Sequence, residues 1–292
     1  MDANNAGRAV LYVVATPLGN LDDITGRAVE ILRRVPVIAC EDTRHSRKLF
    51  QRYGISARLI SYHEHNEQRS AARIVSLLES GTEVALVSDA GTPGISDPGY
   101  RVVKLAVERG IRVVPVPGPS AAAAALSVSS LPTDSYYFYG FLPARESAVR
   151  KEFGQLARLP ATLVFYCPSR RIIRMLSLAA ETLGDRPAAV CRELTKVHEE
   201  VLRGRLSELA AGLSQRETVK GEIVLLIAGC EPDETAGGVL DTAALEGFFS
   251  RVERPETLGA RHLTALAATE LRLPRNRVYP LVCAWLNRKG GG

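Results

Sequence analysis

The chain has 292 residues, of which 46% are hydrophobic and 24% charged, and this balance excludes an intrinsically disordered protein. Residues 1–9 are polar and no run approaches the ~18 apolar residues of a membrane helix, so we expect neither a secretory signal nor a membrane span. The five cysteines are scattered and form no Cys-x-x-Cys pair, which favours reduced thiols in a cytoplasmic protein over disulfides or a zinc site.

The first part of the chain alternates strand-like and helix-like segments. Continuous apolar runs there are typical of strands buried on both faces. Asp97-Pro98 suits a helix start, because Asp caps the helix and Pro fits its first turn. This alternation predicts a mostly parallel sheet with helices on both sides. The expected strands are 10–16, 35–40, 58–61, 83–88 and 113–116, and the other expected helices are 23–34, 43–52 and 67–80.

After Pro117-Gly118-Pro119 the pattern changes to a second α/β lobe with more antiparallel character. A small-residue helix opens this lobe, and an aromatic-rich strand follows it. The expected strands are 135–140, 162–166, 188–192, 199–202 and 222–227, and the expected helices are 119–127, 145–158, 170–183 and 205–212.

The last part of the chain contains no strand pattern. Residues 231–239 are polar and rich in glycine, which indicates a linker. Three short helices are expected after it, at 242–250, 258–271 and 275–286. We therefore divide the chain into an N-terminal α/β lobe (9–117), a second α/β lobe (118–230), a linker (231–240) and a basic helical C-terminal module (241–292).

Positive charge is concentrated in this C-terminal module. Residues 251–292 contain eight basic and three acidic side chains, a net charge of +5 that equals the net charge of the whole chain. A basic lobe on a near-neutral body suggests a polyanionic partner. A solvated surface would give the same charge pattern, so the charge alone does not decide between the two.

Three Gly/Pro loops follow expected strands of the first lobe, at 16–20 (TPLGN), 88–94 (SDAGTPG) and 117–121 (PGPSA). One such loop is ordinarily a plain turn. Three loops at the carboxyl ends of strands in one sheet favour a shared ligand site, where glycine lets the backbone approach the ligand closely. The chain has no G-x-G-x-x-G after the first strand and no G-x-x-x-x-G-K-[ST], so a dinucleotide site or a P-loop lacks support.

These loops belong to a longer series of motifs that carries a family resemblance. In chain order the motifs are LYVVATPLGN (11–20), CEDTR (40–44), VALVSDAGTPGISDPG (84–99), VPGPSAAAAAL (116–126), FYGFLP (138–143), FYCPS (165–169), RELT (192–195) and GEIVL (221–225). Over residues 10–230 the chain resembles the tetrapyrrole methylase superfamily, and within it the bacterial branch that methylates ribosomal RNA.

The resemblance implies two α/β lobes with S-adenosylmethionine bound in the cleft between them. It further implies methyl transfer to the ribose 2'-hydroxyl of a cytidine in 16S rRNA, within the small ribosomal subunit, by a homodimer. The turn at 89–93 reads Asp-Ala-Gly-Thr-Pro, where porphyrin-acting members have a Gly-Asp-Pro-like turn. Matching motif positions assigns donor binding to Pro17, Gly19, Asp89, Ala90, Gly91, Thr92, Ile95, Ser120, Ala121, Tyr166, Leu194 and Gly221.

Transfer to an alcohol also needs a proton acceptor. Glu41 and Asp42 directly follow an expected strand, and His63 follows another, so these three residues are the candidates. A helix cap is the alternative role for Asp42. His63 and His65 flank Glu64 in a pattern that suggests metal ligands, but no complementary ligand set stands at familiar spacing elsewhere, and we expect no metal.

Basic residues in two segments are candidates for RNA phosphate contacts, although an exposed helix face would have the same composition. They are Arg44, Arg47, Lys48, Arg272, Arg275 and Arg277. Two rival functions stay open at this point: methylation of a tetrapyrrole or another small molecule, and RNA binding without catalysis. The basic module weighs against the first, and the intact set of loops weighs against the second.

Overall fold

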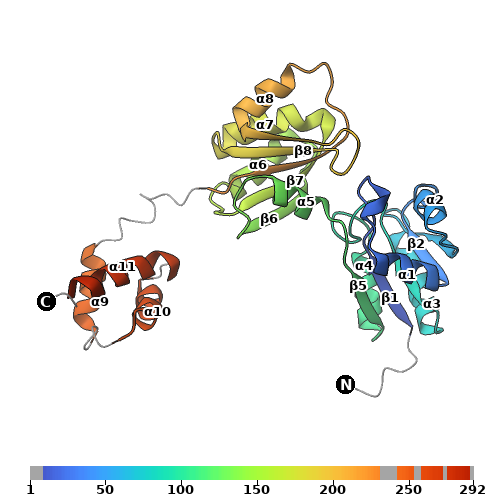
Figure 1. Ribbon diagram of the computed structural model, residues 1–292, viewed down its shortest axis with the longest axis horizontal. Helices are drawn as coiled ribbons and strands as arrows, with labels where there is room; N and C mark the ends of the chain where they lie inside the picture. The colour runs from blue at the N-terminus through green and yellow to red at the C-terminus, as the bar shows by residue number, and fades with distance from the viewer. Residues whose placement is uncertain (1–8, 231–241, 253–257, 272–274, 290–292) are drawn as a thin grey trace. The chain divides into compact units, whose positions relative to one another are not determined.

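The computed structural model describes residues 9–230, 242–252, 258–271 and 275–289, and the chain divides into two compact units at Cys230 (Figure 1). The first unit holds two β-sheets and the second holds helices. Within the described ranges, no helix is both long and apolar enough to cross a membrane. The boundary expected at 118 falls between the two sheets, whereas the expected linker lies outside the described residues.

The first sheet is parallel throughout and has the strand order β3-β2-β4-β1-β5. This confirms the parallel sheet expected from the alternating pattern. All five strands lie within a residue or two of their predicted bounds. The strands are β1 (Val10–Val14), β2 (Val37–Cys40), β3 (Arg58–Ser61), β4 (Val84–Leu86) and β5 (Arg112–Val116).

Four helices cover this sheet, two on each face. Buried side chains of α1 and α2 pack with Tyr12 and Ile38 on one face, and those of α3 and α4 pack with Leu11 and Ala39 on the other. Leu11 and Tyr12 are neighbours in β1, and Ile38 and Ala39 are neighbours in β2. The two members of each pair pack on opposite faces because successive side chains of a strand alternate between them. The helices are α1 (Gly26–Arg34), α2 (Thr43–Arg52), α3 (Glu67–Glu79) and α4 (Tyr100–Glu108).

The second sheet has the order β6-β7-β10-β8-β9, in which only the pair β6–β7 is parallel. Helices α6, α7 and α8 bury one face, and α5 covers the other. The expected antiparallel character of this lobe is therefore confirmed. The elements are α5 (Ala121–Val128), β6 (Tyr136–Phe141), α6 (Glu146–Leu156), β7 (Thr162–Pro168), α7 (Ile172–Leu183), β8 (Pro187–Arg192), β9 (Glu200–Arg205), α8 (Leu206–Ser214) and β10 (Glu222–Ile227).

The second unit has three helices among its described residues, α9 (Thr242–Arg251), α10 (Ala260–Glu270) and α11 (Arg275–Lys289), as the sequence predicts. Phe249 stacks on Trp285 at 4.0 Å between ring centroids, and Val278 and Val282 are buried beside them. Tyr279 is 45% exposed, because the buried face of α11 runs through Val278 and Val282, four residues apart. This unit therefore has an apolar core of its own.

The helix expected to start at Asp97-Pro98 begins later, at Tyr100, with Gly99 as its N-cap. The expectation that Asp97 caps this helix is therefore wrong. Gly99 has φ +159°, and a Cβ on it would lie 3.0 Å from the backbone nitrogen of Gly94. The chain thus closes a tight loop over 94–99 before the helix can start, and the Asp97 side chain is left for another role.

Candidate functional site

The loops after β1, β4 and β5 lie at one edge of the first sheet because these three strands are neighbours in the order β4-β1-β5. Parallel strands bring their carboxyl ends to the same edge. Thr16 and Gly91 join two of these loops by a pair of backbone hydrogen bonds, of 2.8 and 3.0 Å. Thr92 Oγ1 donates to the Pro119 carbonyl at 3.1 Å and joins the third. The three Gly/Pro loops therefore form one connected surface.

A cavity of about 430 Å³, here called the cleft cavity, opens between this surface and the second lobe. Ten of the twelve residues expected to bind the methyl donor line it, and the other two, Pro17 and Gly19, flank its lining residue Leu18. The ten are Asp89, Ala90, Gly91, Thr92, Ile95, Ser120, Ala121, Tyr166, Leu194 and Gly221.

Several lining residues were not expected from the sequence, among them Ser96, Asp97, Phe141 and Glu222. Phe141 and Tyr166 pack edge to face at 5.4 Å between ring centroids and give the cavity an aromatic wall. Phe141 and Glu222 lie within quoted motifs, FYGFLP and GEIVL, but a motif does not show which of its side chains face inward. That depends on strand register, which only the fold sets.

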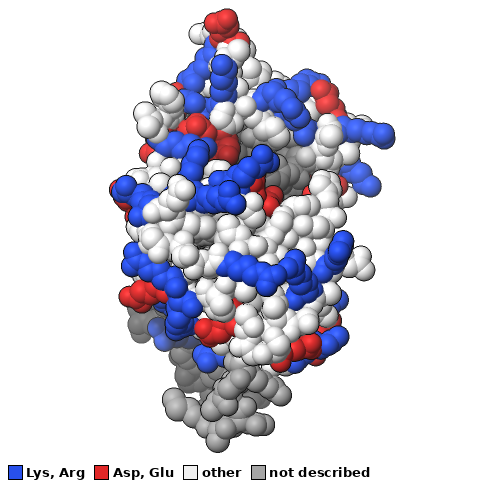
Figure 2. Space-filling model, turned by 90° about the vertical axis from the view of Figure 1, so that its right-hand side faces the viewer, with Lys and Arg blue, Asp and Glu red and all other residues white. Residues whose placement is uncertain are grey.

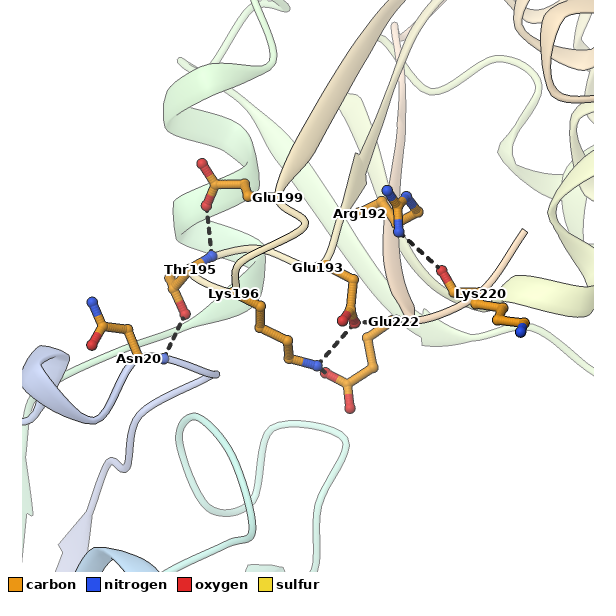
Figure 3. A network of polar contacts seen from close by, with 8 residues as sticks. All are labelled: Asn20, Arg192, Glu193, Thr195, Lys196, Glu199, Lys220 and Glu222. Carbon is orange, nitrogen blue, oxygen red and sulfur yellow. Dashed lines mark hydrogen bonds and ion pairs between the residues drawn. The ribbon is translucent and has the colours of Figure 1, made fainter. Parts of the chain in front are cut away.

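The loop between β8 and β9 reaches across to the first lobe (Figure 3). Thr195 Oγ1 accepts a hydrogen bond from the Asn20 backbone at 3.1 Å. Lys196 Nζ lies 2.9 Å from Glu193 Oε1 and 3.0 Å from Glu222 Oε2. Glu193 and Thr195 both have positive φ, +51° and +65°, so tertiary contacts hold this loop in a conformation that non-glycine residues rarely adopt.

Two glycines make room for this loop. A Cβ on Gly19 would lie 2.2 Å from Cγ of Lys196, and a Cβ on Gly221, where φ is +96°, would lie 2.5 Å from Cγ of Glu193. Both glycines were expected to bind the donor, but only Gly221 lines the cavity. The structure gives Gly19 a packing role, since its open backbone receives the Lys196 side chain. Leu194 lies between these anchors and forms part of the cavity wall.

Carboxyl groups gather on the first-lobe side of the cavity, where Glu41, Asp89 and Asp97 all line it. Burial, followed by the charge on Asp89, raises the pKa of Glu41. Burial is also the main cause that raises the pKa of Asp97, to about 6. The charges on Glu41 and Asp89 contribute to this rise, whereas a hydrogen bond from Ser88 opposes it. The Asp89 carboxylate accepts a hydrogen bond from the Asp42 backbone at 3.0 Å, which joins the loops after β2 and β4.

The two other candidate proton acceptors do not line the cavity. The Asp42 side chain accepts a hydrogen bond from the Arg44 backbone at 2.7 Å and caps α2. His63 Nε2 lies 3.1 Å from the Asn66 side-chain nitrogen, and the other ring nitrogen, Nδ1, is buried without a hydrogen-bond partner. In the described part of the chain, no group of three or more His, Cys, Asp or Glu residues is placed to hold a metal ion.

Of the basic residues expected to contact RNA, the three on α2 are exposed. Arg44 lies 3.7 Å from Asp42, whereas Arg47 and Lys48 take part in none of the ion pairs among the described residues. Lys and Arg side chains are frequent on the face shown in Figure 2 and gather around a central hollow. Arg272 lies outside the described residues, and for Arg275 and Arg277 only the helix that contains them, α11, is described.

Residues 10–210 match the model of the family described as Tetrapyrrole (Corrin/Porphyrin) Methylases. The chain is 46% identical over 288 residues to "Ribosomal RNA small subunit methyltransferase I" of Micromonospora olivasterospora, covering 99% of this chain and 91% of the relative. Proteins of the same name from Escherichia coli O157:H7 and Bacillus subtilis strain 168 are 45% and 42% identical. The E. coli alignment covers 92% of this chain and 93% of the relative, and the B. subtilis alignment covers 92% of each.

Solved structures share the fold at lower sequence identity. Uroporphyrin-III-C-methyltransferase from Thermus thermophilus has a TM-score of 0.55 at 22% identity and covers 76% of this chain and 94% of that protein. Diphthine synthase has a TM-score of 0.58 at 14% identity and covers 76% and 90%. The names of these two proteins indicate different substrates, so the shared fold alone does not indicate what is methylated.

Proposed function

The chain belongs to the tetrapyrrole (corrin/porphyrin) methylase family and is a methyltransferase, and from this premise we propose that it transfers a methyl group from S-adenosylmethionine to the ribose 2'-hydroxyl of a cytidine in 16S rRNA. The observation that carries the proposal is the convergence of three first-lobe loops and the second sheet on one cavity. Relatives at 41–50% identity that are named for the RNA of the small ribosomal subunit support the choice of acceptor.

The residues of the cleft cavity suit the chemistry of the donor. A volume of about 430 Å³ lies in the range of small-molecule sites, roughly 300–1,000 Å³. Apolar walls from Ile95, Tyr166 and Leu194 can hold a flat adenine, and the backbone at Gly91 can approach it without a side chain between. The carboxylates on the first-lobe side offer negative charge to a sulfonium. Bound there, S-adenosylmethionine would supply a methyl group on a positively charged sulfur.

The part of this chain in the reaction is to position the acceptor and to accept its proton, since a ribose hydroxyl is a weak nucleophile at neutral pH. Glu41 is the one residue of the three proposed from the sequence that lines the cavity. Exposed Arg44, Arg47 and Lys48 follow it on α2 and can hold phosphates beside the site. The basic C-terminal module adds positive charge for the same polyanion.

The proposed setting is the cytoplasm, where 16S rRNA and reduced cysteines are found; all five cysteines are free thiols in the structure. A homodimer acting on rRNA within the small ribosomal subunit is part of the same proposal and follows from the family resemblance. Sedimentation analysis of the purified chain measures its oligomeric state directly.

The test combines a labelled donor with mass spectrometry. Purified protein is incubated with methyl-labelled S-adenosylmethionine and small ribosomal subunits from cells that lack this gene. Nucleoside mass spectrometry of the 16S rRNA should then show labelled 2'-O-methylcytidine. Label on a base, or on no nucleoside while the donor is bound, would contradict the proposed acceptor. Label on an added tetrapyrrole would favour the small-molecule rival.

A further inference from the structure

A second cavity borders the cleft cavity at Asp97. It is a groove of about 720 Å³ between α3 and α4, here called the α3–α4 groove, and its lining includes Glu67, Tyr100 and Arg101. Ser96 and Asp97 line both cavities. Asp97 therefore lies between the two cavities. A residue that accepts a proton during transfer between two substrates has to lie at such a position.

The loop that carries Asp97 is held tightly at the junction of the two lobes. Ser96 has φ +62°, a conformation that costs free energy unless surrounding contacts impose it. A Cβ on Gly140, in strand β6 of the second lobe, would lie 2.7 Å from the Ser96 Oγ, so this glycine makes room for the loop. Asp97 and Tyr166 of β7 both line the cleft cavity, and burial, followed by the charge on Asp97, raises the pKa of Tyr166.

The other carboxylates of the cavity are occupied in bracing the loops. Asp89 accepts a hydrogen bond from the Asp42 backbone, and a hydrogen bond from the Asp89 backbone to Glu41 opposes the rise in the pKa of Glu41. Asp42 caps a helix. The side-chain hydrogen bond to Asp97 comes from Ser88, whose hydroxyl also lies 3.3 Å from the Ala90 carbonyl. Asp97 therefore keeps acceptor capacity for a substrate hydroxyl.

We propose that Asp97 is the catalytic residue that takes the proton from the acceptor ribose hydroxyl, with the donor in the cleft cavity and the acceptor nucleotide in the α3–α4 groove. This inference rests on the proposed function. As the ribose oxygen bonds to the methyl carbon, the bond from that carbon to sulfur breaks and leaves its electron pair on sulfur. The hydroxyl proton passes to the Asp97 carboxylate and then to solvent.

The charges of the α3–α4 groove suit a sugar better than a phosphate. Arg101 is paired with Glu67 at 2.9 Å, and Lys104 with Glu108 at 3.8 Å, so both cations of its lining are already neutralised. The remaining carboxylates accept hydrogen bonds from ribose hydroxyls. The exposed Tyr100 offers a ring on which a base can stack. Phosphates would then lie outside the groove.

The charged groups facing Asp97 determine the pH at which it can accept a proton. On the first lobe these are Glu41 and Asp89, with the paired charges of the α3–α4 groove and Glu64 beyond them. On the second lobe Tyr166 faces it. Both carboxylates favour the protonated form of Asp97, and burial acts in the same direction. A pKa of about 6 leaves the carboxylate ionised at neutral pH yet basic enough to act.

The experiment measures single-turnover methylation from pH 5 to 8 with donor and RNA saturating, for wild type, Asp97→Asn and Asp97→Ala. The methylation rate of wild type should increase about tenfold for each unit by which the pH rises toward 6, and should be constant above that. Asp97→Asn should be at least ~100-fold slower at pH 7.5, without that inflection. Added formate should restore Asp97→Ala in proportion to its concentration and leave wild type unchanged. Asp134→Asn, an exposed Asp of the same unit, is the matched control and should react as wild type.

Three outcomes overturn this inference while the proposed function stands, since wild type still methylates the RNA. One is Asp97→Asn reacting at the wild-type rate. Another is a slow variant that keeps the wild-type pH inflection and gains nothing from formate, which is a structural defect. The third is loss of the inflection in Glu41→Gln while Asp97→Asn keeps it. Wild type that binds the donor but methylates no RNA refutes the proposed function, and this inference falls with it.

Discussion

The raised pKa of Asp97 makes the stability of the protein depend on pH. This pKa is 3.8 in the unfolded chain and about 6 in the fold, so between these values the folded state binds the proton more tightly. Stability from this group is therefore present below about pH 4, decreases as the pH rises to about 6, and stays lower above it. Asp97→Asn should gain stability over wild type as the pH rises from 4 to 7, measured by urea unfolding. A stability difference that is constant across this range would contradict the pKa.

Asp42 is the helix cap that the sequence left as the alternative to catalysis. Its carboxylate accepts the Arg44 backbone N–H at 2.7 Å at the start of α2. Asp42→Ala should lower the free energy of unfolding by about 1 kcal/mol and leave the single-turnover methylation rate within about twofold of wild type. Asp42→Ser, which keeps a capping oxygen, should recover the stability. A large loss of rate in a stable Asp42→Ser variant would return Asp42 to the catalytic group.

Local sequence signals explain why Asp42 caps a helix and why Asp97, which was expected to cap one, does not. At Asp42 the residue types that favour a cap coincide with the end of a buried strand, so local and tertiary preferences agree. At Asp97 the Asp-Pro pair favours a helix start, but closing the loop against Gly94 requires glycine at position 99 and delays the helix to Tyr100. A contact between Gly99 and Gly94 is a property of the folded loop that residue types at 97 and 98 do not encode.

At the scale of elements, the β8–β9 loop depends on Gly221. A Cβ there would collide with the Glu193 side chain, whose carboxylate holds Lys196 and the Glu222 backbone N–H, each at 2.9 Å. Gly221→Ala should therefore displace the loop, remove Leu194 from the cavity wall and weaken S-adenosylmethionine binding at least ~10-fold by calorimetry. Gly184→Ala is the matched control. Gly184 has a similar φ of +86°, but nothing lies within 4 Å of the added Cβ.

The two variants separate backbone strain from loop displacement. Both introduce a side chain at positive φ and should each lose roughly 1–2 kcal/mol of stability. Only Gly221→Ala should also lose donor affinity. Equal donor affinities in the two variants would show that the loop does not form the donor site. The sequence indicated Gly221 through the family motif, but it did not indicate Glu193, because their contact joins the start of β10 to the end of β8.

Strand and helix order followed from the sequence more completely than the site did. Continuous apolar runs mark β1, β2 and β4 because parallel strands are buried on both faces. No single apolar run predicts the strand order β4-β1-β5, although this order brings the three Gly/Pro loops together. The sequence also does not indicate which side chains of β6 and β10 face the cavity, so it did not predict Phe141 and Glu222 as lining residues. Periodicity specifies elements, whereas strand order and register specify a cavity.

At the scale of the whole molecule, the two lobes of the first unit line one cavity, so we expect neither lobe to bind the donor alone. The cleft cavity takes its wall from both sheets, and the Asn20–Thr195 hydrogen bond joins the lobes beside it. The second unit differs, since its apolar core is built from its own helices, including Phe248, Leu263 and Val282. Donor binding should therefore depend on the first unit alone, and the second unit is available for a separate task.

That task, we predict, is RNA binding. Residues 251–292 carry a net charge of +5. Each phosphate that the module neutralises releases counterions, so the affinity for RNA should decrease steeply with salt, by a slope of roughly 0.7–0.9 per phosphate contact on logarithmic axes. A chain ending at Cys230 should keep its S-adenosylmethionine affinity by calorimetry, bind RNA more weakly and show a shallower salt slope. The first unit keeps the cations on α2, so some salt dependence should persist. Unchanged RNA affinity and slope in this truncated chain would instead assign the module to dimerisation, which sedimentation of the same sample measures.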